Sequence, residues 1–241
     1  MGPDDEGHRG QALERPARQV PEHAPGEPRA PGPDQEVDPR SQSAVPQAAL
    51  PVADLLARLP GLNTGRFGRP GDPWNLLFLG PAAALSAALE AGGWTRLPDT
   101  YLGSIAGGLG QLARGRRLTL FPPMNFYEQF GRFQDQNWVL VTTPILRRHH
   151  FRLWEAPFTD PEGRQAWWGS ANYDKAARFW DLSHVPDPDV DAERDFIGRT
   201  LAPSAAMQTL MPAAAVPREG KNDKGYPYFT DGRVLVVRVG D

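Results

Sequence analysis

Apolar and polar positions from residue 51 onward follow patterns that predict both helices and strands. Apolar residues recur at helical spacing over 51–59, which predicts a short first helix. A continuous apolar run over 74–80, closed by Gly80-Pro81, is typical of a buried strand. The alanine- and leucine-rich segment 82–91 then predicts a helix that ends at Gly92-Gly93. These segments together predict one early β-α unit.

The middle of the chain predicts mainly strands. A glycine-interrupted helix is expected over 104–114, and strands are expected over 118–121, 138–142, 148–155 and 165–170. The last two strands are joined by 158–163, a segment rich in turn-forming residues, so they should form a hairpin.

The last quarter of the chain predicts one helix and one hairpin. Asp187 can cap a helix that has Pro188 at its first position and extends to Leu201. Asp231-Gly232 between 228–229 and 234–239 indicates a C-terminal hairpin. The order of elements predicts an α+β fold with a mixed or largely antiparallel sheet, one early β-α unit, one late helix and a C-terminal hairpin.

Composition divides the chain at about residue 50. Residues 1–50 contain nine prolines and no Phe, Trp or Tyr, so they cannot bury enough apolar surface to offset the entropy of ordering. We therefore expect 1–50 to be a disordered Pro-rich segment and 51–241 to form a single domain.

Charge and hydropathy narrow the classes of function. Nine acids and five arginines give residues 1–50 a charge of −4; the whole chain carries −3, so the remainder is +1. A nearly neutral domain argues against nucleic acid as a partner. The sequence has no run of about 18 apolar residues and no apolar signal-peptide core. These features predict a soluble, cytoplasmic protein. The absence of cysteine excludes disulfides and thiolate chemistry.

Residues 147–195 concentrate the groups that could bind ligands, with three of the five histidines and four of the seven tryptophans. On a strand, His150, Arg152 and Trp154 share one face, while His149, Phe151 and Leu153 share the other and should face the core. An imidazole, a guanidinium and an indole in a row suit an anionic ligand. The alternative is structural: Arg152 covers an indole within a ladder of cross-strand pairs.

The acidic run after His184, which we expect to lie in a loop, also has two interpretations. Oxygens of Asp187, Asp189 and Asp191 could bind a divalent cation, or the acids could serve only the start of the predicted helix. The spacing does not match an EF-hand, so we predict no cofactor. Arg194 falls on the buried stripe of that helix and is either an anion-binding residue or a paired core residue.

Most catalytic motifs are absent, including Gly-x-Ser-x-Gly and His-Glu-x-x-His. The scheme that the residues allow is acid–base chemistry by His150 or His184, with Asp174 as the orienting carboxylate. Asp187 and Asp189 are alternative orienting groups. Candidate ligand-binding residues are Arg152, Trp154, Tyr173, Asp187, Asp189 and Arg194. The sequence does not decide whether the protein is an enzyme.

Several separated motifs resemble the LssY C-terminal domain family. They are Pro73-x-Asn75-Leu76-x-Phe78-x-Gly80, Gly131-Arg132-x-Gln134-Asp135, Arg148-His149-His150-x-Arg152-x-Trp154, Trp168-Gly169-x-Ala171-x-Tyr173-Asp174, Asp187-Pro188-Asp189-x-Asp191-Ala192-Glu193-Arg194-Asp195 and Tyr228-Phe229-Thr230-Asp231-Gly232-Arg233. Domains of this family also occur fused behind multi-pass membrane domains of the DedA-like and lipid-phosphatase-like types. The resemblance therefore implies a membrane-associated system, a membrane-protein partner and a location peripheral to the membrane. It supplies no catalytic assignment.

Two functions follow as expectations. The first is binding of a small anionic or phosphate-bearing ligand, lipid-linked if the resemblance holds, with hydrolysis as an extension. The alternative is a non-catalytic protein-interaction or accessory domain, in which the tryptophans pack and the acids cap a helix.

Overall fold

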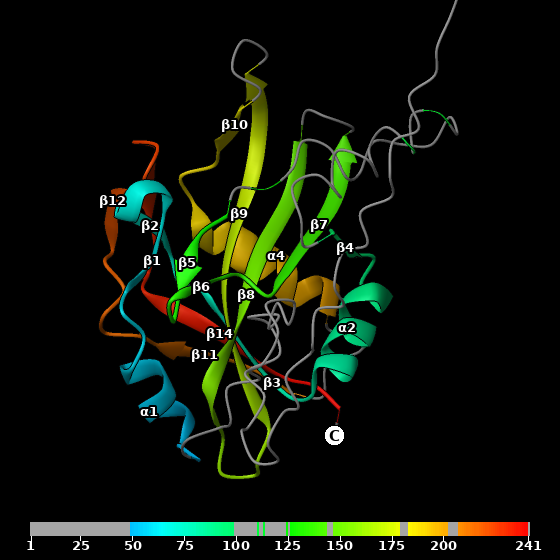
Figure 1. Cartoon of the computed structure of the whole chain (residues 1–241), viewed down its shortest axis with the longest axis vertical. Helices are drawn as coiled ribbons and strands as arrows, with labels where there is room; N and C mark the ends of the chain where they lie inside the picture. Colours follow the sequence, from blue (N-terminus) through cyan, green and yellow to red (C-terminus); the bar gives the residue numbers. More distant parts are fainter. Residues whose placement is uncertain are drawn as a thin grey trace, which may run out of the picture. The chain divides into compact units, whose positions relative to one another are not determined.

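An eight-stranded mixed sheet forms the centre of the protein (Figure 1). The structure is a computed structural model that describes residues 49–98, 110, 113, 124, 126–143, 147–178, 183–201 and 207–240. In spatial order, the strands are β11 (Met207–Pro212), β14 (Arg233–Arg238), β3 (Leu76–Leu79), β9 (Gln165–Arg178), β8 (Arg147–Thr159), β7 (Gln136–Thr143) and β4 (Thr95–Arg96), and β10 (Ser183–Pro186) pairs with the second half of β9. Among the described strands of this sheet, β14 and β3 pair in parallel and the other pairs are antiparallel. The predicted α+β class is confirmed.

The long β8–β9 hairpin determines which side chains share a face. Its turn is closed by Asp160, which accepts hydrogen bonds from the backbone N–H groups of Glu162 and Arg164, and by Gly163 at φ 78°. Because the register pairs Arg148 with Asp174, residues of even number on both strands lie on one face.

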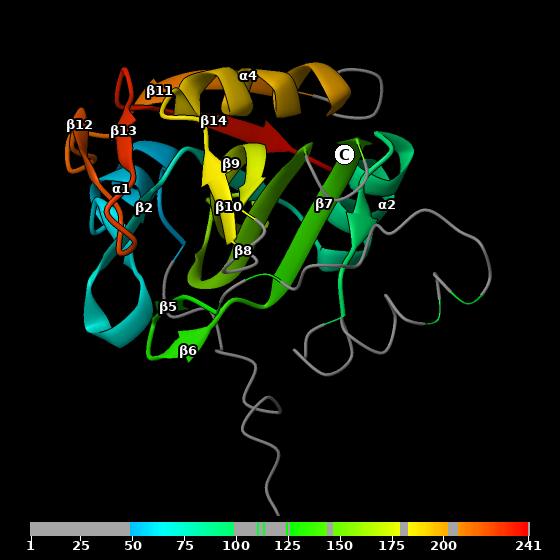
Figure 2. The ribbon, with the colours of Figure 1, turned by 90° about the horizontal axis from the view of Figure 1, so that it is seen from above.

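Helices cover both faces of the sheet (Figure 2). Helices α2 (Ala82–Ala91) and α4 (Val190–Leu201) pack against one face through Leu85, Leu89, Ile197 and Leu201. Helix α1 (Val52–Ala57) packs against the other face, where Trp154 and Trp168 are buried. Burial of apolar side chains on both faces is the main contribution to the stability of the fold. On the face that carries the even-numbered residues of β8, a second layer of structure covers the sheet.

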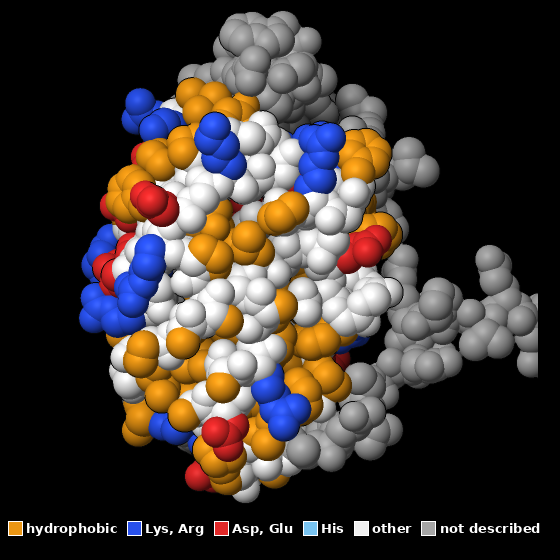
Figure 3. Space-filling view, turned by 90° about the vertical axis from the view of Figure 1, so that its left-hand side faces the viewer, with side chains coloured by type: hydrophobic (Ala, Val, Ile, Leu, Met, Phe, Trp, Pro, Cys, Tyr) orange, Lys and Arg blue, Asp and Glu red, His pale blue; other side chains and the backbone are white. Residues whose placement is uncertain are grey.

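That second layer contains two smaller sheets. One has the order β2 (Pro70–Pro73), β1 (Leu62–Thr64), β5 (Glu128–Gln129) and β6 (Arg132–Phe133), and a 3-10 turn, η1 (Arg66–Gly68), connects β1 to β2. The other is a hairpin of β12 (Glu219–Lys221) and β13 (Pro227–Phe229). Figure 3 views the side of the molecule that carries these elements, where Lys and Arg side chains stand among hydrophobic ones.

Two glycines allow close approach at the centre of the sheet. A Cβ at Gly169 would lie 2.8 Å from the Cβ of Leu76 and 2.9 Å from Cδ2 of Leu153. Gly80, at φ 149°, ends β3, and a Cβ there would lie 2.4 Å from the carbonyl oxygen of Val239. Both positions therefore require glycine for strand packing rather than for ligand contact.

Two sequence expectations differ from the structure in detail. A C-terminal hairpin is present, but its strands are β12 and β13, whereas β14 pairs with β11 and β3. The late helix begins at Val190 rather than after Asp187, because Ser183–Pro186 forms β10, which places His184 in a strand rather than a loop.

Three further expectations fall outside the described residues: the disordered segment, apart from Ala49 and Leu50; almost all of the helix over 104–114; and the strand over 118–121. The residues from Ala49 onward belong to a single compact unit. None of the described helices is long and apolar enough to cross a membrane.

Candidate functional site

A row of buried polar side chains runs along the even-numbered face of β8 and β9. Strand β8 contributes Arg148, His150 and Arg152, and β9 contributes Asn172 and Asp174. All five side chains are buried, although the same strands bury Phe151 and Leu153 in the apolar core on the opposite face. The predicted alternation is thus confirmed. Because burial of charge is unfavourable without partners, this row must be paired internally.

Asp174 is the centre of the first half of the row. Its Oδ2 atom lies 3.0 Å from Nε of Arg148, 3.4 Å from Nδ1 of His150 and 3.3 Å from Nδ1 of His184. His184 reaches this carboxylate because β10 pairs with the end of β9. Neither Nδ1 atom has a hydrogen-bond partner of good geometry among the described residues. One carboxylate is therefore shared by two imidazoles and a guanidinium, as the sequence scheme required of Asp174.

Burial keeps both imidazoles neutral. It lowers the pKa of His150 to about 3, with Arg148 and Arg152 reinforcing the shift and Asp174 opposing it. Burial also lowers the pKa of His184, again against Asp174. Burial alone would raise the pKa of Asp174, but the charge and hydrogen bond of Arg148, 3.0 Å away, favour the ionised carboxylate and the pKa falls. At neutral pH the group is thus an ionised carboxylate beside two uncharged bases.

Arg152 forms the second half of the row. Its Nη1 atom lies 3.3 Å from Oδ2 of Asp72 in β2, and its guanidinium lies 4.3 Å from the ring centroid of Tyr127. The hydroxyl of Tyr127 donates a hydrogen bond to Asp223, which also accepts one of 2.9 Å from Nε of Arg66. Arg152 is therefore held between the sheet and the second layer.

The turn between β12 and β13 delivers three consecutive residues to this region. Nδ2 of Asn222 donates to Asp72 at 3.1 Å, and Asp223 binds Tyr127 and Arg66. Burial lowers the pKa of Lys224, as do the charges of Arg152 and Arg66, and the charge of Lys224 in turn acts on His184. The ammonium therefore stands within electrostatic range of both halves of the row.

We refer to these groups as the polar cluster: Asp72, Arg148, His150, Arg152, Asp174, His184 and Lys224. Three cations and two carboxylates give it a charge of +1 when both histidines are neutral. The cluster combines fixed cations with neutral bases, which is an arrangement suited to an anion and to proton transfer.

The two aromatic candidates, Trp154 and Tyr173, lie outside the polar cluster. Trp154 shares the even-numbered face but is fully buried in the apolar core, where its ring centroid is 5.2 Å from that of Trp74. Tyr173 lies on the opposite face, 4.6 Å from the ring of His149. Their role as ligand-binding residues therefore finds no support in the geometry, because strand alternation and apolar packing place them elsewhere.

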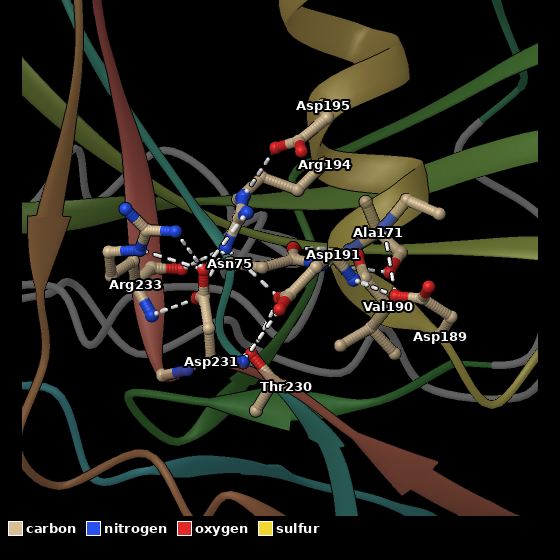
Figure 4. Close-up of polar contacts among 12 residues, drawn as sticks. Asn75, Ala171, Asp189, Val190, Asp191, Arg194, Asp195, Thr230, Asp231 and Arg233 are labelled. Carbon is tan, nitrogen blue, oxygen red and sulfur yellow. Dashed lines mark hydrogen bonds and ion pairs between the residues drawn. The ribbon is translucent and has the colours of Figure 1, made fainter.

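The acidic run belongs to the start of α4 (Figure 4). Oδ1 of Asp189 accepts hydrogen bonds from the backbone N–H groups of Asp191 and Ala192, so Asp189 caps the helix in place of the predicted Asp187. Oδ1 of Asp187 accepts the N–H of Asp189 at 3.1 Å. Both carboxylates thus serve the local backbone.

Arg194 lies in a separate network on α4. Its side chain is 1% exposed, and it binds Asp195, Asp191 and Asp231 at 2.9, 3.0 and 2.7 Å. It also donates to the carbonyl oxygen of Arg233 at 3.0 Å. These contacts match the paired, structural interpretation of Arg194 and separate it from Arg152.

Sequence reasoning missed Asp72, Tyr127, Lys224 and Asn222. Asp72 precedes a proline in a turn-rich segment, and the sequence Asn222-Asp223-Lys224-Gly225 signals only a turn. No local sequence pattern predicts that these segments pack over β8. Arg148 could have been identified from the sequence, because strand alternation places it on the same face as His150.

Comparison with known proteins agrees with the motifs. No curated protein and no solved structure shows significant similarity to the chain. The family described as LssY C-terminus matches residues 56–234, which include all of the polar cluster, and the chain therefore belongs to this family.

Proposed function

We propose that the polar cluster binds a small anionic or phosphate-bearing ligand. The observation that carries the proposal is the shared position of Asp174, between the Nδ1 atoms of His150 and His184, beside fixed cations. Guanidinium groups bind phosphate oxygens through paired hydrogen bonds. A phosphate that enters this environment would offset the net positive charge and raise the pKa of the imidazoles, so that one of them could take up a proton and donate a hydrogen bond to it.

The same arrangement suits hydrolysis of a phosphate ester. One neutral imidazole, oriented by Asp174, would accept a proton as a water oxygen bonds to phosphorus. The bond from phosphorus to the ester oxygen breaks, and the departing oxygen takes a proton from the other imidazole, which has bound a solvent proton because the phosphate raises its pKa. Arg148 and Arg152 would stabilise charge on the phosphoryl oxygens. No metal ion is needed to balance these steps.

Thermal unfolding with candidate ligands tests binding directly. Inorganic phosphate, phenyl phosphate and short-chain phosphatidate are the probes, and phosphatidate separates a lipid-linked ligand from free phosphate. We expect at least one phosphate probe to raise the melting temperature in a concentration-dependent way. His150→Gln and His184→Gln should abolish the shift. His149→Gln is the matched control, since His149 lies on the opposite face.

A second candidate function rests on the pairing of both arginines. Arg148 and Arg152 each already bind a carboxylate, Asp174 and Asp72, which is also how a purely structural polar row would be satisfied. A non-catalytic accessory domain is then the alternative. Absence of any probe-dependent shift, with no phenol released from phenyl phosphate, would favour it. Attachment to a membrane-protein partner stays a prediction from the family resemblance.

A further inference from the structure

An open cavity of about 410 Å³ lies in the second layer, away from the histidines. Its walls come from η1, from β5 and β6, and from the segment before β5. The lining side chains that matter chemically are Arg66, Phe67, Met124, Phe126, Glu128 and Phe133. A volume of this size is typical of small-molecule sites, which combine aromatic walls with a few charged groups. We call it the aromatic cavity.

Phe67 stands exposed at the edge of the aromatic cavity. Its side chain is 92% exposed, and its backbone has φ 60° and ψ 30°, the left-handed conformation that a bulky residue rarely adopts. The turn around it is nevertheless tightly held, because Gly65 N–H donates to the carbonyl of Arg69 at 2.8 Å. A strained backbone that presents an apolar ring to solvent lowers stability and points to a binding role.

Two further rings complete an aromatic wall. The centroids of Phe126 and Phe133 are 5.3 Å apart with planes tilted by 57°, and Phe133 is 53% exposed. Tilted rings at this spacing offer both a face and an edge to a planar group placed between them and Phe67. An aliphatic chain would gain only burial there, whereas a planar ring also gains these directional contacts.

Arg66 supplies the charge of the aromatic cavity. Its backbone N–H and its Nε both donate to Oδ2 of Asp223, at 3.2 and 2.9 Å, which fixes the guanidinium. Its Nη1 and Nη2 atoms have no partner among the described residues, and the side chain is 45% exposed. A fixed guanidinium with two free terminal nitrogens presents the fork that binds a carboxylate, sulfonate or phosphate.

We propose that the aromatic cavity binds an organic anion with a planar aromatic body. The ring system would lie against Phe67, Phe126 and Phe133, and the acidic group would pair with the terminal nitrogens of Arg66. Glu128, on the same wall, would disfavour a second negative charge. This site is distinct from the polar cluster, and the inference does not depend on the proposed function.

The test uses 8-anilinonaphthalene-1-sulfonate, a fluorescent aromatic anion, with the full chain. We expect saturable binding that Phe67→Gly weakens at least about tenfold, the loss that follows removal of one aromatic stacking partner. Phe67→Gly should also raise the melting temperature by roughly 2–4 °C, because glycine relieves the left-handed strain. Phe229→Ser is the matched control: Phe229 is 50% exposed and lies outside the cavity, so dye affinity should not change.

Competition identifies the ligand class. 2-Naphthoate should displace the dye and straight-chain decanoate should not; equal displacement by decanoate would overturn the aromatic assignment. Arg66→Gln should weaken 2-naphthoate but not the neutral 2-naphthalenemethanol, and equal weakening of both would remove the role given to Arg66. Unchanged dye affinity in Phe67→Gly would overturn the site altogether. Any phosphate-induced stabilisation should be the same in Phe67→Gly and wild type, which keeps the two proposals separable.

Discussion

Arg152 and Asp72 form a buried ion pair, with 3.3 Å between Nη1 and Oδ2. The side chain of Arg152 is 4% exposed and that of Asp72 is 6% exposed. The pair joins the central sheet to the β1–β2 layer, although Asp72 precedes Arg152 by 80 positions in the sequence. Burial raises the pKa of Asp72 against the opposing charge of Arg152, so the carboxylate depends on this partner to stay ionised.

Removal of one partner should therefore destabilise the fold. Arg152→Ala leaves Asp72 buried without its cation, and we expect a loss of about 3–5 kcal/mol in the free energy of unfolding. The double variant Asp72→Ala/Arg152→Ala should cost less than the sum of the single changes. Urea unfolding of the four proteins measures the coupling. Strict additivity would show that the pair contributes nothing as a unit.

Arg194, like Arg152, is a buried arginine paired with carboxylates, but it lies outside the proposed ligand site. Arg194→Ala removes a buried cation that Asp191 and Asp231 share, and we expect a loss of about 1.5–3 kcal/mol with no change in phosphate-induced stabilisation. Arg233→Ala is the matched control, because Arg233 binds the same Asp231 but half its side chain is exposed. That change should cost under about 1 kcal/mol. A smaller loss for Arg194 than for Arg233 would contradict the burial argument.

Glu193 should make stability fall as pH rises toward neutrality. Its Oε2 atom lies 2.6 Å from Nδ1 of His149, yet its Oε1 atom has no hydrogen-bond partner in the described part of the chain, and burial raises its pKa to about 7. The folded protein thus keeps a proton that the unfolded chain releases above about pH 4.5. This group's contribution is complete below that pH and is lost, by up to about 3 kcal/mol, as pH rises through 7.

Comparison with Glu193→Gln isolates that effect, since glutamine imitates the protonated acid. Urea unfolding at a series of pH values between 4.5 and 8 should show a difference that grows in favour of the variant as pH rises. A constant difference across the series would mean that Glu193 does not titrate in this window.

His150 should titrate far below an ordinary histidine. Because burial lowers its pKa to about 3, its ring stays uncharged in the folded protein while the unfolded chain binds a proton near pH 6.5. Its contribution to stability is present above pH 6.5 and is lost as pH falls toward 3. Ring-proton NMR, assigned with His150→Gln, checks this in the absence of phosphate. A midpoint at or above 6.5 would place the ring in a solvated site instead.

A methyl group added at Gly169 should destabilise the protein, because this position lies at a closely packed point of the central sheet. Gly169→Ala places a methyl group against Leu76 and Leu153 between paired strands, and we expect a loss of about 1–3 kcal/mol. Gly163→Ala, in an open turn, meets no atom within 4 Å but has φ 78°, so its cost should be strain alone, about 1 kcal/mol. Thermal unfolding of both variants gives the comparison.

Local patterns were sufficient for the elements that are local in origin. Helix α2 was predicted at its observed bounds, because the apolar spacing and the two glycines after it are all within the segment. The faces of β8 followed from alternation alone, so His150 and Arg152 were placed together on one side. Asp174 was a candidate beyond the end of the expected strand over 165–170, whereas in the structure β9 extends to Arg178 and pairs Asp174 with Arg148.

Elements that depend on distant partners could not be predicted in this way. The segment around His184 forms β10 only because the end of β9 offers an unpaired edge, and this pairing moves the start of α4 to Val190. Asp72 and Lys224 meet β8 through tertiary packing that leaves no periodic signal in the sequence. The sequence left Arg152 either as a ligand-binding residue or as a cover for an indole, and could not show that a carboxylate 80 positions away pairs with it.

The position of β14 has a consequence for the order in which the protein can become functional during synthesis. This strand follows all the other described strands in the sequence, yet it pairs with β3 in the interior of the sheet, and the turn that carries Lys224 is made shortly before it. A ribosome-bound chain that has not released these residues lacks part of the central sheet and one of the three cations around the histidines. Synthesis from the N-terminus therefore produces the β8–β9 hairpin, which carries His150, before the Lys224 turn and β14 that complete the site around it.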